Sequence, residues 1–411
     1  MRTNKQRGAV SLFVASVLLI AALAMSLASY RNLFFQIKRA QNEIDSRKAH
    51  WLAEGGVECA FALVASMTST PINFSDCAKP SLTISLNSPS PTKHTITANV
   101  SGTKVKKSYS KGFNSRGGAI QSSADLYFHT STTFSTPDPG ELTVDGWECV
   151  ALRYKNQWAF HGSITNSGVV HGDTPYAGFN SQGIDCRIDH KTNVANSTQA
   201  TQRDFLQDTS MNLFYDFFGV KPDEHNKVRD NGIFTQISNH ANDCGTAIKD
   251  KITQGKLHIW VEGSCEIKAD EYEALATASM DTDGVLILVH DGVLSLMGGS
   301  MGGKKIKGIL FHFNYEFLPQ INGTHWNNLD AKNALYPSGT VNGNFPTDYL
   351  NRATFYQHGA FTMTGGQILD LNGQAALFYT SLNMRYNGDV FSSVFDPLAQ
   401  PRWVKGSWHD F

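Results

Sequence analysis

A run of twenty residues near the N-terminus, 9–28, contains no charged side chain. A helix of that length rises about 30 Å, which matches the hydrocarbon thickness of a lipid bilayer. A short basic leader, residues 1–8, precedes the run. A secretory signal peptide would be cleaved at a small-residue site after the run, and residues 27–29 do not fit that pattern well. A cut between Gly8 and Ala9 would instead leave the apolar helix on the mature protein.

Two motifs beyond the leader narrow the class of protein. Residues 51–58 read WLAEGGVE, and residues 401–411 read PRWVKGSWHDF. The leader with its apolar run resembles the type III signal of type IV prepilins and of type II secretion pseudopilins. The two motifs are similar to the AAEAGIE-like and PGSW-type segments of PilX-type minor pilins. These matches cover residues 1–63 and the tail, and a plain N-terminal membrane anchor is the simpler alternative.

The resemblance implies a route through the cell envelope. Prepilin peptidase would remove residues 1–8, and the new N-terminal residue, Ala9, would be N-methylated. The helix would hold the chain in the inner membrane as a single span with a periplasmic head. Assembly would then move the helix into a fibre, where the partners are the major pilin and other minor pilins.

The fifth position of the mature chain departs from the major-pilin pattern, which has Glu there. This chain has Phe13. A carboxylate inside a bilayer costs roughly 2.5–3.5 kcal/mol, so a family keeps it only for a task. In pilins that task is thought to be pairing with the N-terminal amine of the previously assembled subunit, and a subunit that begins the fibre has no such neighbour. Phe13 therefore indicates a tip subunit, with loss of the Glu and a substitute contact as the alternative.

Charge and cysteine content favour an exported protein. The formal net charge of −1 provides no global attraction to nucleic acid or anionic lipid. The cysteines lack metal-ligand spacing, and in an oxidising periplasm they are expected to form disulfides. Sequential pairing is the simplest of the fifteen connectivities that six cysteines allow, and free buried thiols are the alternative. The six are Cys59, Cys77, Cys149, Cys186, Cys244 and Cys265.

The expected fold class is α+β. Residues 9 to about 67 lack proline and carry an apolar stripe at helical spacing, which predicts one long helix with a kink or a close backbone contact at Gly55-Gly56. Residues 81–86, 94–100 and 104–113 alternate in polarity, so three antiparallel strands would form a small pilin-like head. The expected domains are the leader 1–8, the transmembrane or fibre-core helix 9–28, the amphipathic helix and head 29–113, and a β-rich C-terminal domain 114–411.

Short apolar runs separated by glycine turns characterise the last of these domains, as at 257–261, 285–289 and 308–313. Repeated short strands with turns predict the stacked coils of a partial β-solenoid, with an irregular sandwich as the alternative. Helices are expected at 201–225 and 269–280.

The sequence contains none of the catalytic motifs for nucleophilic, nucleotide-binding or zinc-protease chemistry, so the chain is expected not to be an enzyme. The segment 281–284, DTDG, is a fragment of a calcium loop without the remaining ligands, and an ordinary turn is favoured over a calcium site. The glycine-rich segment 297–305 lacks the spacing of a phosphate-binding loop and is interpreted as a turn. No cofactor is expected.

A group of cations is the best nucleic-acid candidate. Lysines at alternate positions share one face of a strand, and neighbouring aromatic side chains could stack on bases. A solvated edge that discourages strand pairing is the commoner role of such lysines. The candidate DNA contacts are Lys104, Lys106, Lys107, Lys111 and Arg116.

These features favour a minor pilin that primes type IV pilus assembly and sits at the extracellular pilus tip, where it could contribute to adhesion or DNA uptake. A minor pseudopilin at the tip of a type II secretion pseudopilus is the main alternative, although its head would normally carry an α-rich insertion. A tip adhesin or DNA receptor, in contact with an extracellular surface or with DNA, is compatible with the first hypothesis. An anchored periplasmic enzyme is the weakest candidate.

Processing supplies the first prediction. The N-terminal sequence of the mature protein isolated from envelopes should begin at Ala9, with the basic leader removed and the apolar run retained. Edman sequencing or mass spectrometry of the N-terminal peptide would measure this. A mature chain that begins at any other residue contradicts the prediction.

Overall fold

The computed structural model describes most of the chain and divides it into two compact units. The first unit takes in the chain up to Ser110 together with the segment from Trp403 onward, and the second unit spans Lys111–Arg402. The last residues therefore group with the N-terminal unit, whereas the sequence division placed them in the C-terminal domain. The described residues are 6–66, 73–88, 93–111, 117–171, 173–195, 202–298, 303–337, 340, 342–399 and 401–410.

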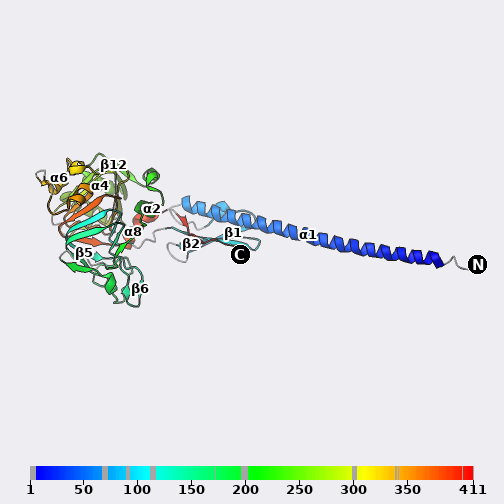
Figure 1. Cartoon of the computed structure of the whole chain (residues 1–411). Helices are drawn as coiled ribbons and strands as arrows, with labels where there is room; N and C mark the ends of the chain where they lie inside the picture. The colour runs from blue at the N-terminus through cyan, green and yellow to red at the C-terminus, as the bar shows by residue number, and fades with distance from the viewer. Residues whose placement is uncertain are drawn as a thin grey trace, which may run out of the picture. The chain divides into compact units, whose positions relative to one another are not determined.

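The first unit is organised by one helix, α1 (Gln6–Ser66), which runs for 61 residues without interruption (Figure 1). Its length is roughly 90 Å at the rise of an α-helix. The absence of proline and the supporting ion pair between Arg47 and Glu43, 2.7 Å apart, are consistent with this continuity. The predicted α+β class, with a long N-terminal helix followed by a large β-rich region, is confirmed.

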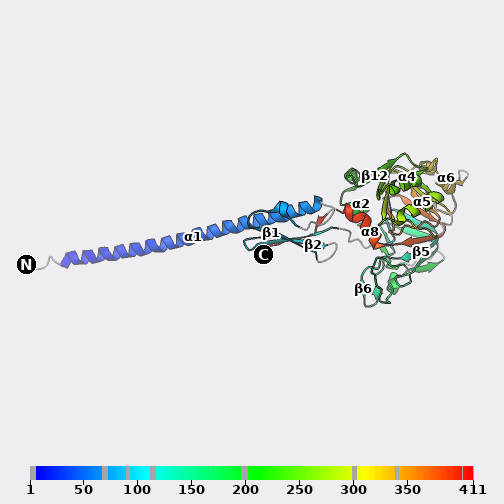
Figure 2. The same ribbon diagram turned by 180° about the vertical axis from the view of Figure 1, so that it is seen from behind.

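A small sheet packs on the C-terminal part of α1, as both side views show (Figures 1 and 2). Its antiparallel order is β1–β2–β3, and two short segments of the C-terminal tail pair with β3. In β2, every second residue is buried against the helix. The strands are β1 (Leu82–Asn87), β2 (Lys93–Val100), β3 (Thr103–Ser110), β22 (Arg402–Trp403) and β23 (His409–Asp410).

Small side chains let α1 approach this sheet closely. Ala53, Val57, Ala60 and Val64 recur at intervals of three or four residues and are completely buried. This stripe forms one apolar cluster with β2 and β3. The sheet therefore covers one face of the second half of α1.

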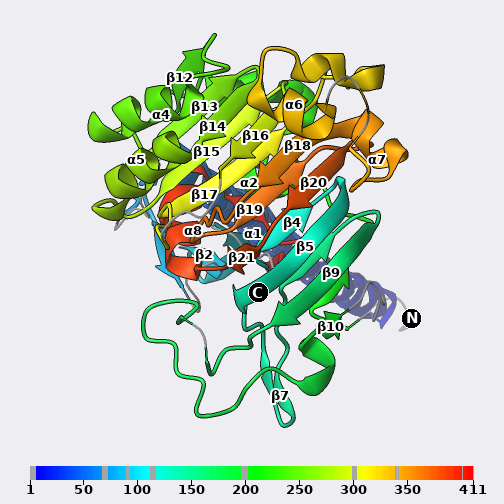
Figure 3. The same ribbon diagram turned by 90° about the vertical axis from the view of Figure 1, so that its left-hand side faces the viewer.

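Two larger sheets make up the second unit (Figure 3). In spatial order the first contains β11 (Phe205–Gln207), β8 (Leu152–Tyr154), β4 (Ile120–Ser122), β19 (Gln367–Asp370), β17 (Gly308–Phe313), β15 (Val285–His290), β13 (His258–Glu262) and β12 (Thr235–Ser238). The second contains β10 (Asn193–Ala195), β9 (Trp158–Asn166), β5 (Asp125–Thr136), β20 (Ala375–Tyr379), β18 (Ala353–His358), β16 (Leu294–Met297) and β14 (Cys265–Lys268), and β21 (Leu382–Arg385) pairs with β5. A separate small hairpin joins β6 (Leu142–Thr143) to β7 (Gly146–Trp147).

Successive strands alternate between the two large sheets and thereby form stacked coils. The chain passes from β13 to β14, from β15 to β16, from β17 to β18 and from β19 to β20, and each strand pairs in parallel with the equivalent strand of the next coil. The β4–β5 coil, which comes first in the chain, pairs with the last one, β19–β20. Apolar side chains between the sheets, Phe128, Phe355 and Phe378 among them, form the main core.

Helices cover parts of the outer faces. Strands β15 and β17 are buried along their whole length, because α2 (Leu213–Phe218) and α8 (Gly388–Phe395) pack on their outer side. The remaining short helices are α3 (Asn226–Arg229), α4 (Cys244–Thr253), α5 (Ala269–Met280), α6 (Asp330–Leu335) and α7 (Thr347–Arg352).

One of the two helix predictions in this unit is confirmed, because α5 spans residues 269–280. The predicted helix at 201–225 is wrong. That segment contains β11, the six residues of α2 and the short 3₁₀ turn η3 (Pro222–Glu224). Gly219 ends α2 with φ of 71°, a left-handed conformation that closes a helix.

The adjacent glycines of α1 have different surroundings. A Cβ atom on Gly56 would lie 2.9 Å from Leu82 Cδ1 and 3.5 Å from Ala98 Cβ, whereas a Cβ on Gly55 would meet nothing within 4 Å. The expected kink is absent, since α1 continues through both residues. The close contact is at Gly56 alone, and its partners are side chains and not the expected backbone.

A matched pair of substitutions tests this contact. Gly56→Val should destabilise the first unit by about 1–3 kcal/mol, because the new side chain overpacks the helix–sheet contact. Gly55→Val should change stability by less than about 0.5 kcal/mol, since valine is a slightly better helix former than glycine. Hydrogen exchange of β2 amides in the two purified variants would measure the difference. Equal effects would contradict the close contact.

Candidate functional site

The N-terminal part of α1 exposes a long apolar surface. Phe13 has 68% of its surface exposed, and the hydroxyl of Ser16 donates a hydrogen bond to the Phe13 carbonyl oxygen at 2.8 Å. That bond satisfies the polar group of Ser16 within the helix itself. By length and composition, α1 is the one helix among the described residues that could cross a membrane, and its most apolar window is not buried. The other large apolar side chains exposed between residues 9 and 44 are Val10, Leu12, Val14, Val17, Leu18, Leu19, Ile20, Leu23, Met25, Leu27, Tyr30, Leu33, Phe34, Phe35, Ile37 and Ile44.

A disulfide fixes the other end of α1. Cys59 is bonded to Cys77, with a Cα–Cα distance of 5.8 Å, and Cys77 lies in the short 3₁₀ turn η1 (Ser75–Cys77). A loop of this length gives a disulfide stabilisation of about 3 kcal/mol in the chain-entropy model. The helix end is thereby tied to the segment that leads into the sheet.

Strand β3 separates the candidate lysines onto its two faces. Lys104 and Lys106 lie on one face, while Lys107 lies on the face that contains buried Val105 and Tyr109. The Lys107 ammonium forms an ion pair with Glu58 of α1 at 2.8 Å. It also lies 4.0 Å from the ring centre of Trp403 and 4.9 Å from that of Trp408. Lys107 therefore joins the helix, the sheet and the tail.

We call Glu58, Phe61, Lys107, Trp403 and Trp408 the tail cluster. The rings of Phe61 and Trp403 are stacked with centroids 4.0 Å apart. The cluster combines residues of the WLAEGGVE-containing helix with residues of the PRWVKGSWHDF tail. The contact between these two motifs could not be predicted from the sequence, because their residues are more than 300 positions apart.

Hydrogen bonds complete the attachment of the tail. The Ser407 hydroxyl donates to the carbonyl oxygen of Ser108 at 3.0 Å and accepts from the Ser108 amide at 3.1 Å. The amide of Val404 donates to the same carbonyl oxygen at 2.9 Å. Beside them, burial raises the pKa of Tyr109 to about 12, so this phenol stays neutral at physiological pH. The tail is thus an integral part of the first unit.

The structure places the remaining candidate cations in different settings. Lys104 is exposed, and Lys106 is half-buried opposite His409 in the β3–β23 pairing. Lys111 belongs to the second unit, where burial lowers its pKa and the nearby Asp396 carboxylate acts in the opposite direction. Arg116 lies outside the described residues. DNA contact by these side chains stays a prediction.

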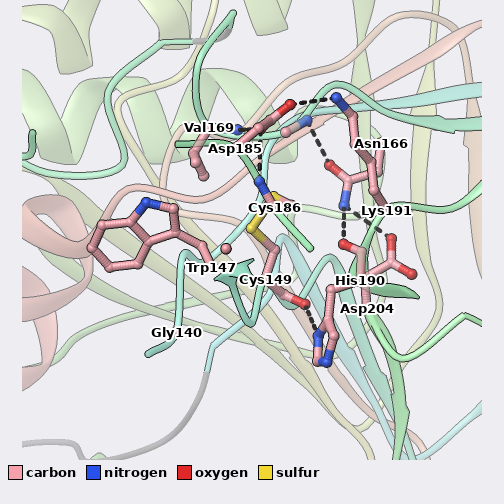
Figure 4. The surroundings of a disulfide bond; sticks show 12 residues. Gly140, Trp147, Cys149, Asn166, Val169, Asp185, Cys186, His190, Lys191 and Asp204 are labelled. Atoms are coloured by element: carbon pink, nitrogen blue, oxygen red, sulfur yellow. Dashed lines mark hydrogen bonds and ion pairs between the residues drawn. A yellow bond between two sulfur atoms is a disulfide. The ribbon is translucent and has the colours of Figure 1, made fainter. Parts of the chain in front are cut away.

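The second unit contains two further disulfides, Cys149–Cys186 and Cys244–Cys265, so the pairing of all six cysteines is sequential. Figure 4 shows the polar surroundings of the Cys149–Cys186 disulfide. Burial opposes ionisation of Asp185, but the Lys191 ammonium and the amides of Val169 and Cys186 outweigh it and lower the pKa of this carboxyl. The arrangement holds a long loop in place.

A second carboxylate near this disulfide is completely buried. Asp204 accepts hydrogen bonds from the amide and hydroxyl of Thr192, at 2.9 and 2.5 Å, and from the Asn166 side chain at 2.9 Å. His190 Nδ1 lies 3.0 Å from the carbonyl oxygen of Cys149. These groups hydrogen-bond mainly to one another, which is typical of a structural network.

The calcium-loop fragment forms a turn after α5. Gly284 packs against α8 with φ of 147°, and the Ser393 hydroxyl donates to the Asp283 carbonyl oxygen at 2.8 Å. Within the described ranges, no group of three or more His, Cys, Asp or Glu side chains could hold a metal ion. Part of the glycine-rich segment 297–305 lies outside the described residues, so its interpretation as a turn stays a prediction.

No protein-family model, no curated protein and no solved structure matches the chain.

A pair of lysine substitutions tests the tail cluster. Lys107→Met should weaken the tail by about 1 kcal/mol, through loss of the half-buried cation–π contacts. The Val404 amide should then exchange its hydrogen about fivefold faster, as hydrogen-exchange mass spectrometry of the tail peptide would show. Lys104→Met, on the exposed face of the same strand, should leave the rate unchanged. Similar rates in both variants would show that Lys107 does not hold the tail.

Proposed function

We propose that this chain is a minor pilin that primes type IV pilus assembly and occupies the pilus tip. The observation that carries the proposal is the contrast between the two parts of α1. The part that includes residues 9–28 is uncharged and exposed, while the part from Ala53 to Val64 buries one face against the small sheet of a folded head. Such an extended apolar surface needs an apolar partner, which a bilayer provides before assembly and neighbouring helices provide in a fibre.

Phe13 supports the tip position within this proposal. Its apolar ring replaces the carboxylate by which major pilins are thought to engage a preceding subunit, so this helix can begin a fibre without that pairing. The prepilin peptidase, the major pilin and the other minor pilins are the partners proposed. Before assembly the protein would be a single-pass inner-membrane protein with a periplasmic head.

The second unit supports a display role. It is a large disulfide-stabilised domain between two segments of the first unit, Ser110 and Trp403, and it is not needed to bury the helix. A subunit at the tip would present this domain to an extracellular surface or to DNA. Adhesion and DNA uptake are therefore proposed as secondary roles.

A minor pseudopilin at the tip of a type II secretion pseudopilus is the alternative. The exposed helix and Phe13 are compatible with either assembly. The β-rich second unit favours the pilus, because the pseudopilin heads of that position normally carry an α-rich insertion.

In-frame deletion of the coding sequence in the source bacterium tests the proposal. Surface pili, counted by electron microscopy, should disappear and should return on expression of the full chain. A Gly8→Leu chain, which keeps its leader, should be made but should not restore pili. If pili persist while export of secreted enzymes fails, the pseudopilin alternative is correct. If both persist, neither assembly role holds.

A shortened chain separates assembly from display. Joining Ser110 to Trp403 through a short Gly-Ser linker removes the second unit but keeps the tail cluster, since the Ser108 carbonyl and Val404 amide are 2.9 Å apart. We expect this chain to restore pili that lack attachment or DNA uptake. A chain that stops at Ser110 is the matched control and should restore fewer pili, because it also lacks the tail.

A further inference from the structure

A row of side chains crosses the outer face of the second large sheet of the second unit, which faces the viewer in Figure 3. Each member is the register partner of the next on adjacent parallel strands. We call this set the ring row. In spatial order its members are Met297, His358, Tyr379, His129 and His161.

The alternation of strand side chains places the ring row on the outside. The residues that immediately precede its members include Phe128, Phe378 and Gln357, and all three are buried between the sheets. His161 is exposed, and Tyr379 is half-buried. Five adjacent strands span about 19 Å at a strand spacing of ~4.8 Å, so the row is long enough for several units of a polymer.

The rings of the row lie close to one another. The centroids of His161 and His129 are 4.7 Å apart, those of His129 and Tyr379 are 5.6 Å apart, and those of Tyr379 and His358 are 5.1 Å apart. Four consecutive rings therefore form a continuous track. Burial lowers the pKa of His129 and of His358, so these two rings are neutral at physiological pH.

A neighbouring loop holds the track in place. The side-chain amide of Asn344 donates a hydrogen bond to the Tyr379 hydroxyl at 3.2 Å. The ring of Phe345 lies 6.0 Å from that of His129 and 5.9 Å from that of Tyr379. Such fixed rings lose little conformational entropy when a ligand binds.

One flank of the ring row is polar and uncharged, while Tyr127, Leu377 and Tyr356 form the other. Among the described outward-facing residues within two positions of the row on these strands, none is Lys, Arg, Asp or Glu. Hydroxyl groups lie on one side, at Ser131 and Ser163, and further along at Thr133 and Thr165. The nearest cation on this face, Lys268, is the register partner of Met297 on β14, and its ammonium forms an ion pair with Asp330 at 3.1 Å.

We propose that the ring row binds a neutral polysaccharide in an extended conformation, with the sugar chain running across the strands. The rings of His129 and His161 are stacked with an interplanar angle of 22°, so a ligand would meet the edges of the rings. Imidazole nitrogens and a phenol hydroxyl at those edges can exchange hydrogen bonds with sugar hydroxyls. Sugar hydroxyls find partners in the flanking serines and threonines. A nucleic acid or an anionic glycan would need lysines or arginines along its path, and the row lacks them. This site belongs to the second unit alone and does not depend on the pilus proposal.

Binding to defined oligosaccharides tests this site. The purified full chain, in a detergent without a sugar headgroup, would be titrated by calorimetry with hexasaccharides of β-linked glucose, of N-acetylglucosamine and of α-linked mannose. We expect saturable binding to at least one of them. His161→Ala removes an exposed ring and should weaken that binding at least tenfold, and Tyr379→Ala should do the same. Tyr315→Ala removes an exposed tyrosine outside the row and should leave affinity unchanged.

The outcomes are distinct. If none of the three sugars binds, or if His161→Ala binds as well as the unaltered chain, the proposal is wrong. If a thymidine oligonucleotide or heparin binds instead and depends on the row, the ligand is a polyanion and the proposal is also wrong. Circular dichroism would confirm that the variants are folded. The His161→Ala chain should still restore pili, so failure of the sugar site and failure of the pilus proposal can be told apart.

Discussion

The second unit depends on the parallel pairing of its last coil with its first. Strands β19 and β20 pair with β4 and β5, so segments more than 200 residues apart form neighbouring rungs of both sheets. The pairing continues the core between the sheets and fixes the register of β5 and β9 relative to β20. The ring row exists only because of that register. Long-range parallel pairing of this kind closes large loops, which makes folding slow. The two disulfides of this unit stabilise it by restricting the unfolded chain.

In the first unit, one helix serves two environments. From Ala53 onward its small side chains fit a sheet, and at Gly56 the side chains of Leu82 and Ala98 approach the helix closely. Toward the N-terminus the same helix carries large apolar side chains that no described part of the chain covers. Because the helix is continuous, the folded head fixes the direction in which the exposed apolar part of α1 extends. The proposed functions in membrane and fibre follow from this division.

The sequence predicts elements whose pattern is local. The helix from residue 9, the strands of the small sheet and helix 269–280 all follow from periodicity within a short window. The segment 201–225 fails because its apolar residues belong partly to a strand and partly to a short helix, a difference that depends on tertiary packing. The role of Lys107 could not be predicted, since its partners Trp403 and Trp408 are distant in sequence. The ring row could not be predicted for the same reason, because His129 and Tyr379 become neighbours only through strand register.

The tail cluster has a consequence for biosynthesis. A chain is synthesised from its N-terminus, so the segment from Trp403 onward is the last of the described parts to be made. The small sheet therefore remains incomplete until the entire second unit has been synthesised, with Phe61 and Lys107 lacking their tryptophan partners in the meantime. Closure of the tail on β3 thus marks a chain that has been synthesised in full. A chain truncated before Trp403 would present an unfinished head, which distinguishes it physically from a complete one.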